Sequence, residues 1–516
     1  MNGAVALLKT ASAGGIEICF ANPGTTEIPL VVALDQVPGI RAVLCLFEGV
    51  CTGAADGYGR MKGSPAMSIL HLGPGLANGV ANLHNARRAK TPIVNLIGEH
   101  ATWHKEADAP LAMDVEALAS TVSGWCRTND AARNFSLDMA EAISASRQGQ
   151  TATLVAPHDH QLEEAGDTIV SMPGVAADPL NAGVIEKTAN LLKCSKRPAL
   201  LLGGQALLEP GLRLAARVRT FTGCDLLVEN FPARVECGVG LPPLTRIPYF
   251  PEPALSMLSV YDLVVLVGTR EPVTFFGYVG VNSYLLTKDQ KKILIPSGNG
   301  GVTEALEYLA NILESGKGSQ SKAEISDKPV RPQVPIGTLT PEKVCLTLAA
   351  IQPEGAIIVD EGLTTALTYF PLTVGLPRMT CMTIVGGSIG YGMPCASGAA
   401  VACPDRPVIN LQADGSAAYT VQALWTQARE GLNVTTLLCS NRSYNIVRVE
   451  LERAGVTTPG PYAQSLTDLG HPAIDWVRIA RGFGVPGVSV DTADDLAREI
   501  RHALADPGPH LIEMCI

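Results

Sequence analysis

Val408-Ile-Asn-Leu-Gln-Ala-Asp-Gly-Ser416 is the stretch that decides the fold. It indicates an apolar strand that ends in a tight turn, with Ser416 placed to cap the helix that follows. That helix is expected over residues 417–430 and ends at Gly431, a common helix stop. A second apolar strand follows over Val434–Cys439. This order predicts a right-handed β-α-β unit with two parallel strands.

Polar residues follow both of these strands. Asp414 and Gly415 come after the first strand, and Asn441 comes after the second. Because parallel strands end at the same edge of a sheet, we expect Asp414 and Asn441 to lie close together. Their oxygens, with a nearby backbone carbonyl, suit Mg²⁺, and the Gly415 amide at a helix start suits a phosphate. Either residue alone fits a helix cap or a turn, but the pair favours a metal and phosphate site.

The same alternation of apolar strands and helices runs along the whole chain, which predicts an α/β protein with parallel sheets. Two irregular segments, at residues 157–179 and 314–335, indicate linkers. Further strands are expected at residues 16–20, 42–47, 66–71, 92–97 and 356–359, and at the apolar runs that begin at Pro198 and Asp262. We therefore predict three doubly wound parallel-sheet domains over residues 1–165, 180–315 and 336–516.

Composition narrows the function classes. The 516 residues are 47% hydrophobic and 17% charged, with a net charge of −10, which fits several packed cores. No basic cluster offers a nucleic-acid or anionic-membrane surface, and no apolar run is long enough to span a bilayer. The 13 cysteines lack metal-like spacing and are expected to be free thiols. Met1–Gly15 does not resemble a signal peptide, so we expect a cytoplasmic protein.

A second informative stretch is Leu44-Cys-Leu-Phe-Glu48-Gly-Val-Cys-Thr-Gly-Ala-Ala-Asp-Gly-Tyr-Gly-Arg60. Glu48 follows an apolar strand and opens a helix of small residues. A glutamate at this position could simply stabilise the helix dipole. It could also be a buried, readily protonated carboxyl group that takes part in proton transfer.

Together the two stretches resemble the thiamine-diphosphate enzyme family, and the resemblance covers nearly the whole chain. Its cofactor motif is Gly-Asp-Gly, followed one strand–helix–strand unit later by Asn. The resemblance implies Mg²⁺ ligands at Asp414, Asn441 and the carbonyl of Ser443. This chain departs from the motif at Ala413, where the family usually has Gly, and at Arg442, where many members have a second Asn.

The glycine-rich stretch Val385-Gly-Gly-Ser-Ile-Gly-Tyr-Gly-Met-Pro394 also looks like the family. There, a bulky apolar residue props the cofactor in a bent shape, and Ile389 occupies that place. The activating glutamate of the family, which hydrogen-bonds the aminopyrimidine so that the C2 proton can be removed, corresponds to Glu48. The cofactor-binding set implied by the resemblance comprises Glu48, Thr364, Gly387, Ile389, Asp414, Gly415, Ser416 and Asn441.

Other polar groups are expected at the same edge as Glu48. Thr25 follows the first strand and His71 ends the third. Within the family this arrangement is similar to benzoylformate decarboxylase, whose active site uses a hydroxyl and an imidazole at such positions. The resemblance implies catalytic roles for Glu48, His71 and Thr25, although a histidine at a strand end can equally be structural.

Departures from the family branches leave the reaction subtype open. The middle-domain histidine of benzoylformate decarboxylase has no counterpart in Thr269–Tyr278, where Phe275 and Phe276 stand among other aromatics. Val447 occupies the place of a glutamate in pyruvate-decarboxylase-type enzymes. Gly73-Pro-Gly75 resembles the acetolactate-synthase branch, but Leu111 lies near the place of its usual glutamine.

The sequence thus predicts a thiamine-diphosphate- and Mg²⁺-dependent decarboxylase or carboligase acting on a 2-oxo acid. One alternative is a lyase or oxidoreductase that binds FAD or another nucleotide, although Leu202-Gly-Gly-Gln lacks the dinucleotide fingerprint. The other is a non-catalytic paralogue, against which Glu48 argues. The resemblance also implies a homodimer or homotetramer, with each cofactor held between two subunits.

Overall fold

The computed structural model describes residues 1–170, 180–295, 301–315 and 328–516. The chain divides into two compact units. The first comprises Met1–Gly174, Gln333–Leu367 and Thr383–Ile516, and the second comprises Val175–Pro332 and Thr368–Met382. The expected linkers lie partly outside the described residues, at 171–179 and 316–327. The described start of the first is not wholly irregular, because residues His158–Leu162 form helix α7.

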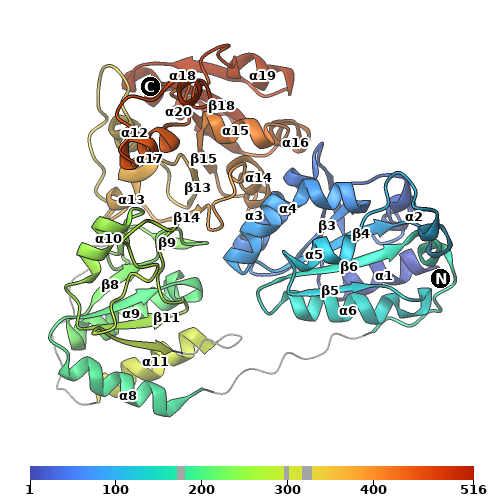
Figure 1. Ribbon diagram of the computed structural model, residues 1–516, viewed down its shortest axis with the longest axis horizontal. Coiled ribbons are helices and arrows are strands. Elements are labelled where there is room, and N and C mark those ends of the chain that lie inside the picture. Colours follow the sequence, from blue (N-terminus) through green and yellow to red (C-terminus); the bar gives the residue numbers. More distant parts are fainter. Residues whose placement is uncertain (171–179, 296–300, 316–327) are drawn as a thin grey trace. The chain divides into compact units, whose positions relative to one another are not determined.

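The first unit opens with a six-stranded sheet of order β2-β1-β3-β4-β6-β5 (Figure 1), in which all neighbouring strands are parallel. Its strands are β1 (Ile18–Asn22), β2 (Arg41–Leu44), β3 (Ala66–His71), β4 (Ile93–Glu99), β5 (Trp125–Thr128) and β6 (Thr151–Pro157). β4 and β6 are buried along their whole lengths. That pattern is typical of parallel strands covered by helices on both faces.

Helices cover this sheet on both sides (Figure 1). The helices are α1 (Gly3–Ala13), α2 (Ile28–Leu34), α3 (Glu48–Lys62), α4 (Leu72–Ala89), α5 (Val115–Ser120) and α6 (Phe135–Ser146). One hydrophobic core lies between the strands and α1 and α6, with Leu7, Leu8 and Phe135 fully buried. Helices α3 and α4 pack together on β1, β3 and β4, so that Glu48 and His71 lie near their first turns.

The first unit also contains five parallel strands near the C-terminus, in the order β17-β18-β16-β15-β13. They are β13 (Ala356–Glu361), β15 (Val408–Ala413), β16 (Val434–Ser440), β17 (Gly487–Val490) and β18 (His510–Cys515). The helices of this region are α12 (Pro341–Ile351), α14 (Gly392–Ala402), α15 (Asp414–Thr420), α16 (Ala423–Glu430), α17 (Asn445–Arg453), α18 (Pro461–Ser465), α19 (Trp476–Gly482) and α20 (Ala493–Ala505).

Helices α3 and α14 pack with their backbones close together because glycines line the contact. A Cβ atom on Gly57 would overlap the backbone of Cys395, and a Cβ atom on Gly398 would overlap the carbonyl of Ala54. Small residues permit this close approach. The contact joins the helix that begins at Glu48 to the helix that follows the Ile389 stretch.

The second unit contains a parallel sheet of order β10-β8-β7-β11-β12 (Figure 1). Its strands are β7 (Pro198–Leu202), β8 (Asp225–Val228), β10 (Thr245–Arg246), β11 (Leu263–Val267) and β12 (Lys291–Ile295). Its helices include α8 (Ala182–Cys194), α9 (Glu209–Thr222), α10 (Pro251–Leu258), α11 (Gly301–Glu314) and α13 (Tyr369–Leu372). A short strand, β9 (Val235–Cys237), pairs antiparallel with β14 (Met379–Thr383).

The predicted fold class is confirmed, since three sheets dominated by parallel strands are present. One detail was wrong: the single helix expected over residues 417–430 is two helices, α15 and α16. Ser416 does not cap α15, because the helix already begins at Asp414 and the Ser416 hydroxyl donates to the carbonyl of Ala413 at 3.0 Å. Gly431 does end α16 in the left-handed conformation. None of the described helices is long and apolar enough to cross a membrane.

Candidate active site

Asp414 and Asn441 meet at the carboxyl edge of the C-terminal strands. β15 and β16 pair in parallel up to Ala413 and Cys439, so the next residues of both strands emerge side by side. The Asp414 carboxylate accepts from the backbone N–H groups of Gly415 and Arg442, each at 2.7 Å. The Asn441 side-chain oxygen accepts from the N–H of Ser443 at 3.0 Å. The predicted metal ligands therefore lie on two adjacent turns. The turn after β16 is hydrogen-bonded to Asp414 through the backbone N–H of Arg442.

The electrostatic surroundings of Asp414 suit a cation. The residue is 3% exposed. Burial raises the pKa of Asp414 above its usual value, nearby Glu513 raises it further, and the backbone N–H groups of Gly415 and Arg442 oppose the rise. A divalent cation would offset the energetic cost of burying the ionised Asp414 carboxylate. Among the described residues no group of three or more His, Cys, Asp or Glu could hold a metal. The carboxylate, amide and carbonyl oxygens present here instead fit Mg²⁺.

Three non-glycine residues with left-handed backbones follow strands at these edges. Leu72 (φ 52°) follows β3, Leu363 (φ 46°) follows β13, and Arg442 (φ 53°) follows β16. Such conformations cost energy for residues with a Cβ atom and are concentrated at functional sites. The left-handed backbone also explains why an Asn suits position 442, since Asn adopts this conformation more readily than Arg.

Replacing Arg442 by Asn should therefore stabilise the protein by about 0.5 to 1 kcal/mol, because strain at the left-handed position falls. The measurement is the urea midpoint without cofactor. Arg442→Ala is the matched control, since it removes the same exposed side chain but lacks the short polar group that lets Asn adopt the left-handed conformation. An equal rise of the urea midpoint in both variants would show that loss of the Arg442 side chain stabilises the protein, and not relief of backbone strain.

Other predicted cofactor residues of the C-terminal region lie around the same edge. The hydroxyl of Thr364 accepts from the Asn445 side chain at 3.4 Å. A Cβ atom on Gly415 would lie 2.5 Å from the Tyr444 ring, so that position needs glycine. The Ser416 hydroxyl accepts from Gln412 at 2.6 Å and is buried. Roles for Thr364, Gly415 and Ser416 in holding a diphosphate stay predictions.

The loop that carries Ile389 rests on a buried acid that the sequence analysis did not single out. Glu361, at the end of β13, is fully buried, and burial raises its pKa above the usual range. Its carboxylate accepts from the N–H groups of Gly390, Tyr391 and Gly392 at 2.8, 3.1 and 2.7 Å. Ile389 itself is only partly buried. Its side chain is thus available for contact with a bound molecule.

Glu48 is the first residue of α3 and is 7% exposed. The side chain of Asn78, on α4, donates to its carboxylate at 3.0 Å. A Cβ atom on Gly75 would lie 3.2 Å from Glu48 Oε1 and 3.4 Å from the Cβ atom of His71. Gly75 therefore lets Glu48 and His71 approach from two sides, as the strand ends predicted.

His71 pairs with a second buried acid. Its Nδ1 atom lies 2.7 Å from the carboxylate of Glu27, which is fully buried, whereas the His71 side chain is 23% exposed. Thr26 donates to the other Glu27 oxygen at 2.6 Å and lies 3.3 Å from His71 Nδ1. A carboxylate oxygen accepts this hydrogen bond, so the proton between them lies on His71 Nδ1 and Nε2 is left for other partners. Thr25, the predicted hydroxyl, is exposed, and its side chain has no hydrogen bond to this pair among the described residues.

In the described part of the central sheet, carboxylates lie at the helix start that follows β7. Gly203 and Gly204 follow β7, as in a nucleotide-binding turn. At the start of α9, however, Glu236 accepts from the N–H of Glu209 at 2.7 Å, and Glu209 pairs with Arg378 at 2.6 Å. Carboxylates thus occupy the helix N-terminus where a pyrophosphate would bind. Phe275 and Phe276 are 39% and 53% exposed in this unit.

Comparison with known proteins agrees with these features. Residues 1–118 match the model "Thiamine pyrophosphate enzyme, N-terminal TPP binding domain", and residues 364–514 match "Thiamine pyrophosphate enzyme, C-terminal TPP binding domain". A Mycobacterium tuberculosis protein named "Putative acetolactate synthase large subunit IlvX" is 46% identical over 100% of this chain and 99% of its own length. The chain belongs to the thiamine pyrophosphate enzyme family, and it is a thiamine-diphosphate-dependent enzyme.

More distant relatives share the full length. Benzoylformate decarboxylase of Pseudomonas aeruginosa is 28% identical over 97% of this chain and 96% of its own. The structure of 4-hydroxybenzoylformate decarboxylase from Rhodococcus jostii RHA1 matches with a TM-score of 0.87 at 24% identity, over 99% of this chain and 98% of that one. At that identity the structural match supports the fold alone.

Three residues of the site were missed at the sequence level. Glu27 stands two positions after Thr25 and Glu361 ends the stretch Val359-Asp-Glu, so both follow strands and could have been found as acids at a sheet edge. Asn78 follows Gly73-Pro-Gly75 on the same helix, but no spacing rule connects it to Glu48.

Proposed function

We propose that this enzyme removes CO₂ from a 2-oxo acid and protonates the product to an aldehyde, with thiamine diphosphate and Mg²⁺ as cofactors. The observation that carries the proposal is the pairing of His71 with the buried Glu27 beside Glu48. A positioned imidazole next to the activating acid can take up a proton from solvent at Nε2 and donate that proton to the product, which favours protonation over addition to a second carbonyl. We expect no flavin requirement, because carboxylates lie at the N-terminus of α9 in the described part of the central sheet.

The cofactor, when bound, supplies a nucleophilic carbon and an electron sink for the decarboxylation. Glu48 would share a proton with its pyrimidine end, and Asn78 would orient the Glu48 carboxylate. Asp414, Asn441 and the Ser443 carbonyl would hold Mg²⁺. We assign the pyrimidine end to a domain over residues 1–165 and the diphosphate and metal to a domain over residues 336–516, with a central domain at 180–315.

Product analysis with a panel of aryl and aliphatic 2-oxo acids tests the proposal. We expect CO₂ release that depends on both added cofactors, with an aldehyde as the main product. Release of CO₂ with formation of a hydroxyketone would instead assign carboligation. Binding of thiamine diphosphate without turnover of any acid would contradict the proposal and favour a non-catalytic role.

Replacing Glu27 by Gln should lower turnover by about 10²-fold, because the amide no longer fixes the proton on His71 Nδ1. Cofactor affinity should stay at the wild-type value, since the Glu27 carboxylate hydrogen-bonds only to His71, Thr26 and the N–H of Gly24 within the described residues. Steady-state rates and a cofactor titration measure the two quantities. Thr26→Val is the control: it removes one contact to Glu27 but keeps the Glu27–His71 pair, so we expect a small effect.

We further propose a homodimer, or a dimer of dimers, in which Glu48 of one subunit faces the Asp414 site of its partner. Within the described residues, no hydrogen bond joins Glu48 to the residues around Asp414. Apolar side chains near that edge, Tyr419 and Val447, are 52% and 45% exposed, which suits a surface covered by a second copy. We also propose that the enzyme works in the cytoplasm.

A further inference from the structure

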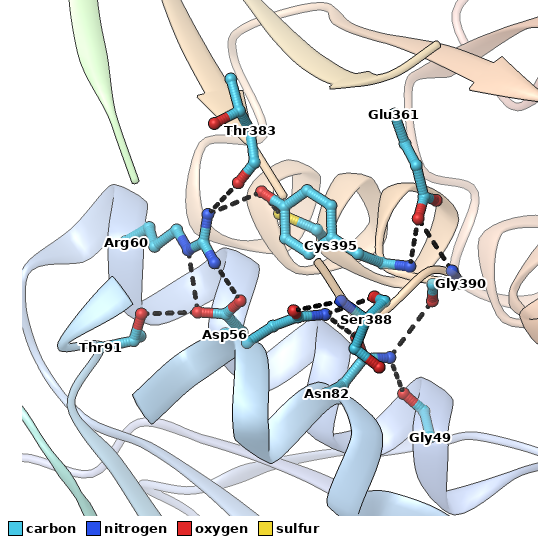
Figure 2. Close-up of polar contacts among 12 residues, drawn as sticks. Gly49, Asp56, Arg60, Asn82, Thr91, Glu361, Thr383, Ser388, Gly390 and Cys395 are labelled. Atoms are coloured by element: carbon cyan, nitrogen blue, oxygen red, sulfur yellow. Dashed lines mark hydrogen bonds and ion pairs between the residues drawn. The ribbon is translucent and has the colours of Figure 1, made fainter. Parts of the chain in front are cut away.

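The loop over residues 387–390 is held by side chains from two directions, and the arrangement has a consequence for cofactor binding. Glu361, at the end of β13, accepts hydrogen bonds from the backbone N–H groups of Gly390, Tyr391 and Gly392. Two asparagines of α4 also reach this loop: Asn82, which Figure 2 labels, and Asn85. Both asparagines are buried, at 2% and 0% exposure.

Asn85 forms a two-point clamp on Ser388. Its amide nitrogen donates to the carbonyl of Ser388 at 2.7 Å, and its oxygen accepts from the N–H of Ser388 at 3.2 Å. A Cβ atom on Gly386 would lie 2.6 Å from that oxygen, so glycine there permits the clamp. Because both polar groups of one backbone residue are bonded to one rigid side chain, Ser388 has little freedom to rotate.

Asn82 extends the network to the next residue and to α3. Its amide nitrogen donates to the carbonyl of Gly390 at 3.2 Å and to the carbonyl of Gly49 at 2.9 Å. Its oxygen accepts from Asn85 at 3.0 Å. Figure 2 shows the bonds from Asn82 to Gly390 and Gly49. Every polar side-chain atom of both asparagines is thus used.

Two backbone groups on either side of Ser388, at Gly387 and Ile389, are not used by these contacts. Within the described part of the chain, the C=O of Gly387 and the N–H of Ile389 have no hydrogen-bond partner. Gly387 has a positive φ of 73°, and Ile389 is only partly buried. One free acceptor and one free donor, two residues apart on a fixed loop, match the amino group and a ring nitrogen of an aminopyrimidine.

We propose that Asn82 and Asn85 are positioning residues for the pyrimidine end of the cofactor, acting through the backbone of residues 387–390 without touching the cofactor. The inference rests on the proposed function. The clamp sets the direction of the Gly387 carbonyl and the Ile389 amide before the cofactor arrives, so binding does not have to order the loop.

The test separates the two ends of the cofactor. In Asn85→Ser and Asn85→Asp, we expect the Kd for thiamine diphosphate with Mg²⁺ to rise about tenfold, the change that corresponds to 1.4 kcal/mol. The Kd for inorganic pyrophosphate with Mg²⁺ should stay unchanged, because the diphosphate end does not use the loop. Calorimetry measures both constants without turnover. Equal loss for both ligands, or unchanged affinity for both, would overturn the proposal.

Gln427→Ala is the matched control. Gln427 is another fully buried amide that bonds to α14, at the carbonyl of Met393 and the hydroxyl of Ser397, but it does not touch residues 387–390. We expect lower stability and an unchanged Kd for thiamine diphosphate. A Kd that rises as much in this control as in the Asn85 variants would show a general packing effect and refute the specific role.

Hydrogen exchange of the wild-type protein gives a measurement that does not depend on how the variants fold. The N–H groups of Ser388 and Gly390 should be protected before cofactor is added, because each is bonded to a buried side chain. Rapid exchange without cofactor would contradict the proposed preorganisation. If the wild type bound no thiamine diphosphate at all, the proposed function itself would fail, which is a distinct result.

Discussion

Glu48→Gln should lower turnover by about 10²- to 10⁴-fold, the usual contribution of a general acid–base group. Gln keeps the size of the side chain and the bond from Asn78, which can donate to the amide oxygen as it does to the carboxylate at 3.0 Å. It cannot share a proton with the pyrimidine ring. Steady-state kinetics with the best 2-oxo acid measures the loss, and a titration with thiamine diphosphate and Mg²⁺ should show binding close to that of the wild type.

Glu17→Gln controls for the loss of an acid from the same region. Glu17 precedes β1, is exposed and accepts from the hydroxyl of Tyr58 at 3.4 Å, away from the strand ends that carry Glu48 and His71. We expect its turnover to match the wild type. Normal turnover in Glu48→Gln would show that Glu48 does not activate the cofactor, and it would contradict the proposed mechanism.

The fold and two residue pairs of the candidate site, Asp414 with Asn441 and Glu48 with His71, could be predicted because the residues after parallel strands lie at one edge of a sheet. The apolar run before Asp414 and the run over Val434–Cys439 predict neighbouring parallel strands, which places Asp414 and Asn441 at one edge, and the observed strand pairing agrees. The same reasoning placed Glu48 beside His71. In both cases the periodicity of the strand and the position of its end carried the information.

What could not be predicted depends on side-chain direction in irregular segments. Thr25 and Thr26 are adjacent in a short 3₁₀ turn, and only the structure shows that the hydroxyl of Thr26 faces His71. Glu27 lies in the same turn, and its burial depends on Gly98 in β4, where a Cβ atom would overlap its carboxylate. No local pattern links residues so far apart in the chain.

The break between α15 and α16 has a related cause. The residues from Ala417 to Glu430 contain no proline or glycine that would signal a stop. The chain nevertheless turns at Val421 and Gln422. Thr420, the last residue of α15, donates its hydroxyl to the carbonyl of Gly390 at 2.9 Å. This tertiary hydrogen bond to the Ile389 loop coincides with the end of α15. Helix propensity depends on local sequence, so it does not predict a helix end of this kind.

Asp414→Ala should weaken the binding of thiamine diphosphate and Mg²⁺ by about 10²-fold or more, because even outer partners of a metal site contribute 10- to 100-fold. It removes the only carboxylate of the proposed ligand set. The measurement is the rise in thermal midpoint on adding both cofactors, which follows from ligand binding to the folded state. We expect a clear rise in the wild type and in Glu48→Gln and little or none in Asp414→Ala. A normal rise in Asp414→Ala would exclude this metal site.

Mixing the two variants decides whether Glu48 and Asp414 of different subunits build one site. Random reassortment of equal amounts of Glu48→Gln and Asp414→Ala makes half of the dimers hybrids. Each hybrid has one intact site if the sites lie between subunits, so activity returns to about a quarter of the wild-type value. If both residues served a site within one chain, the mixture would stay inactive. The reciprocal mixture, a double variant with wild type, should give about a quarter for shared sites and about half for sites within one chain.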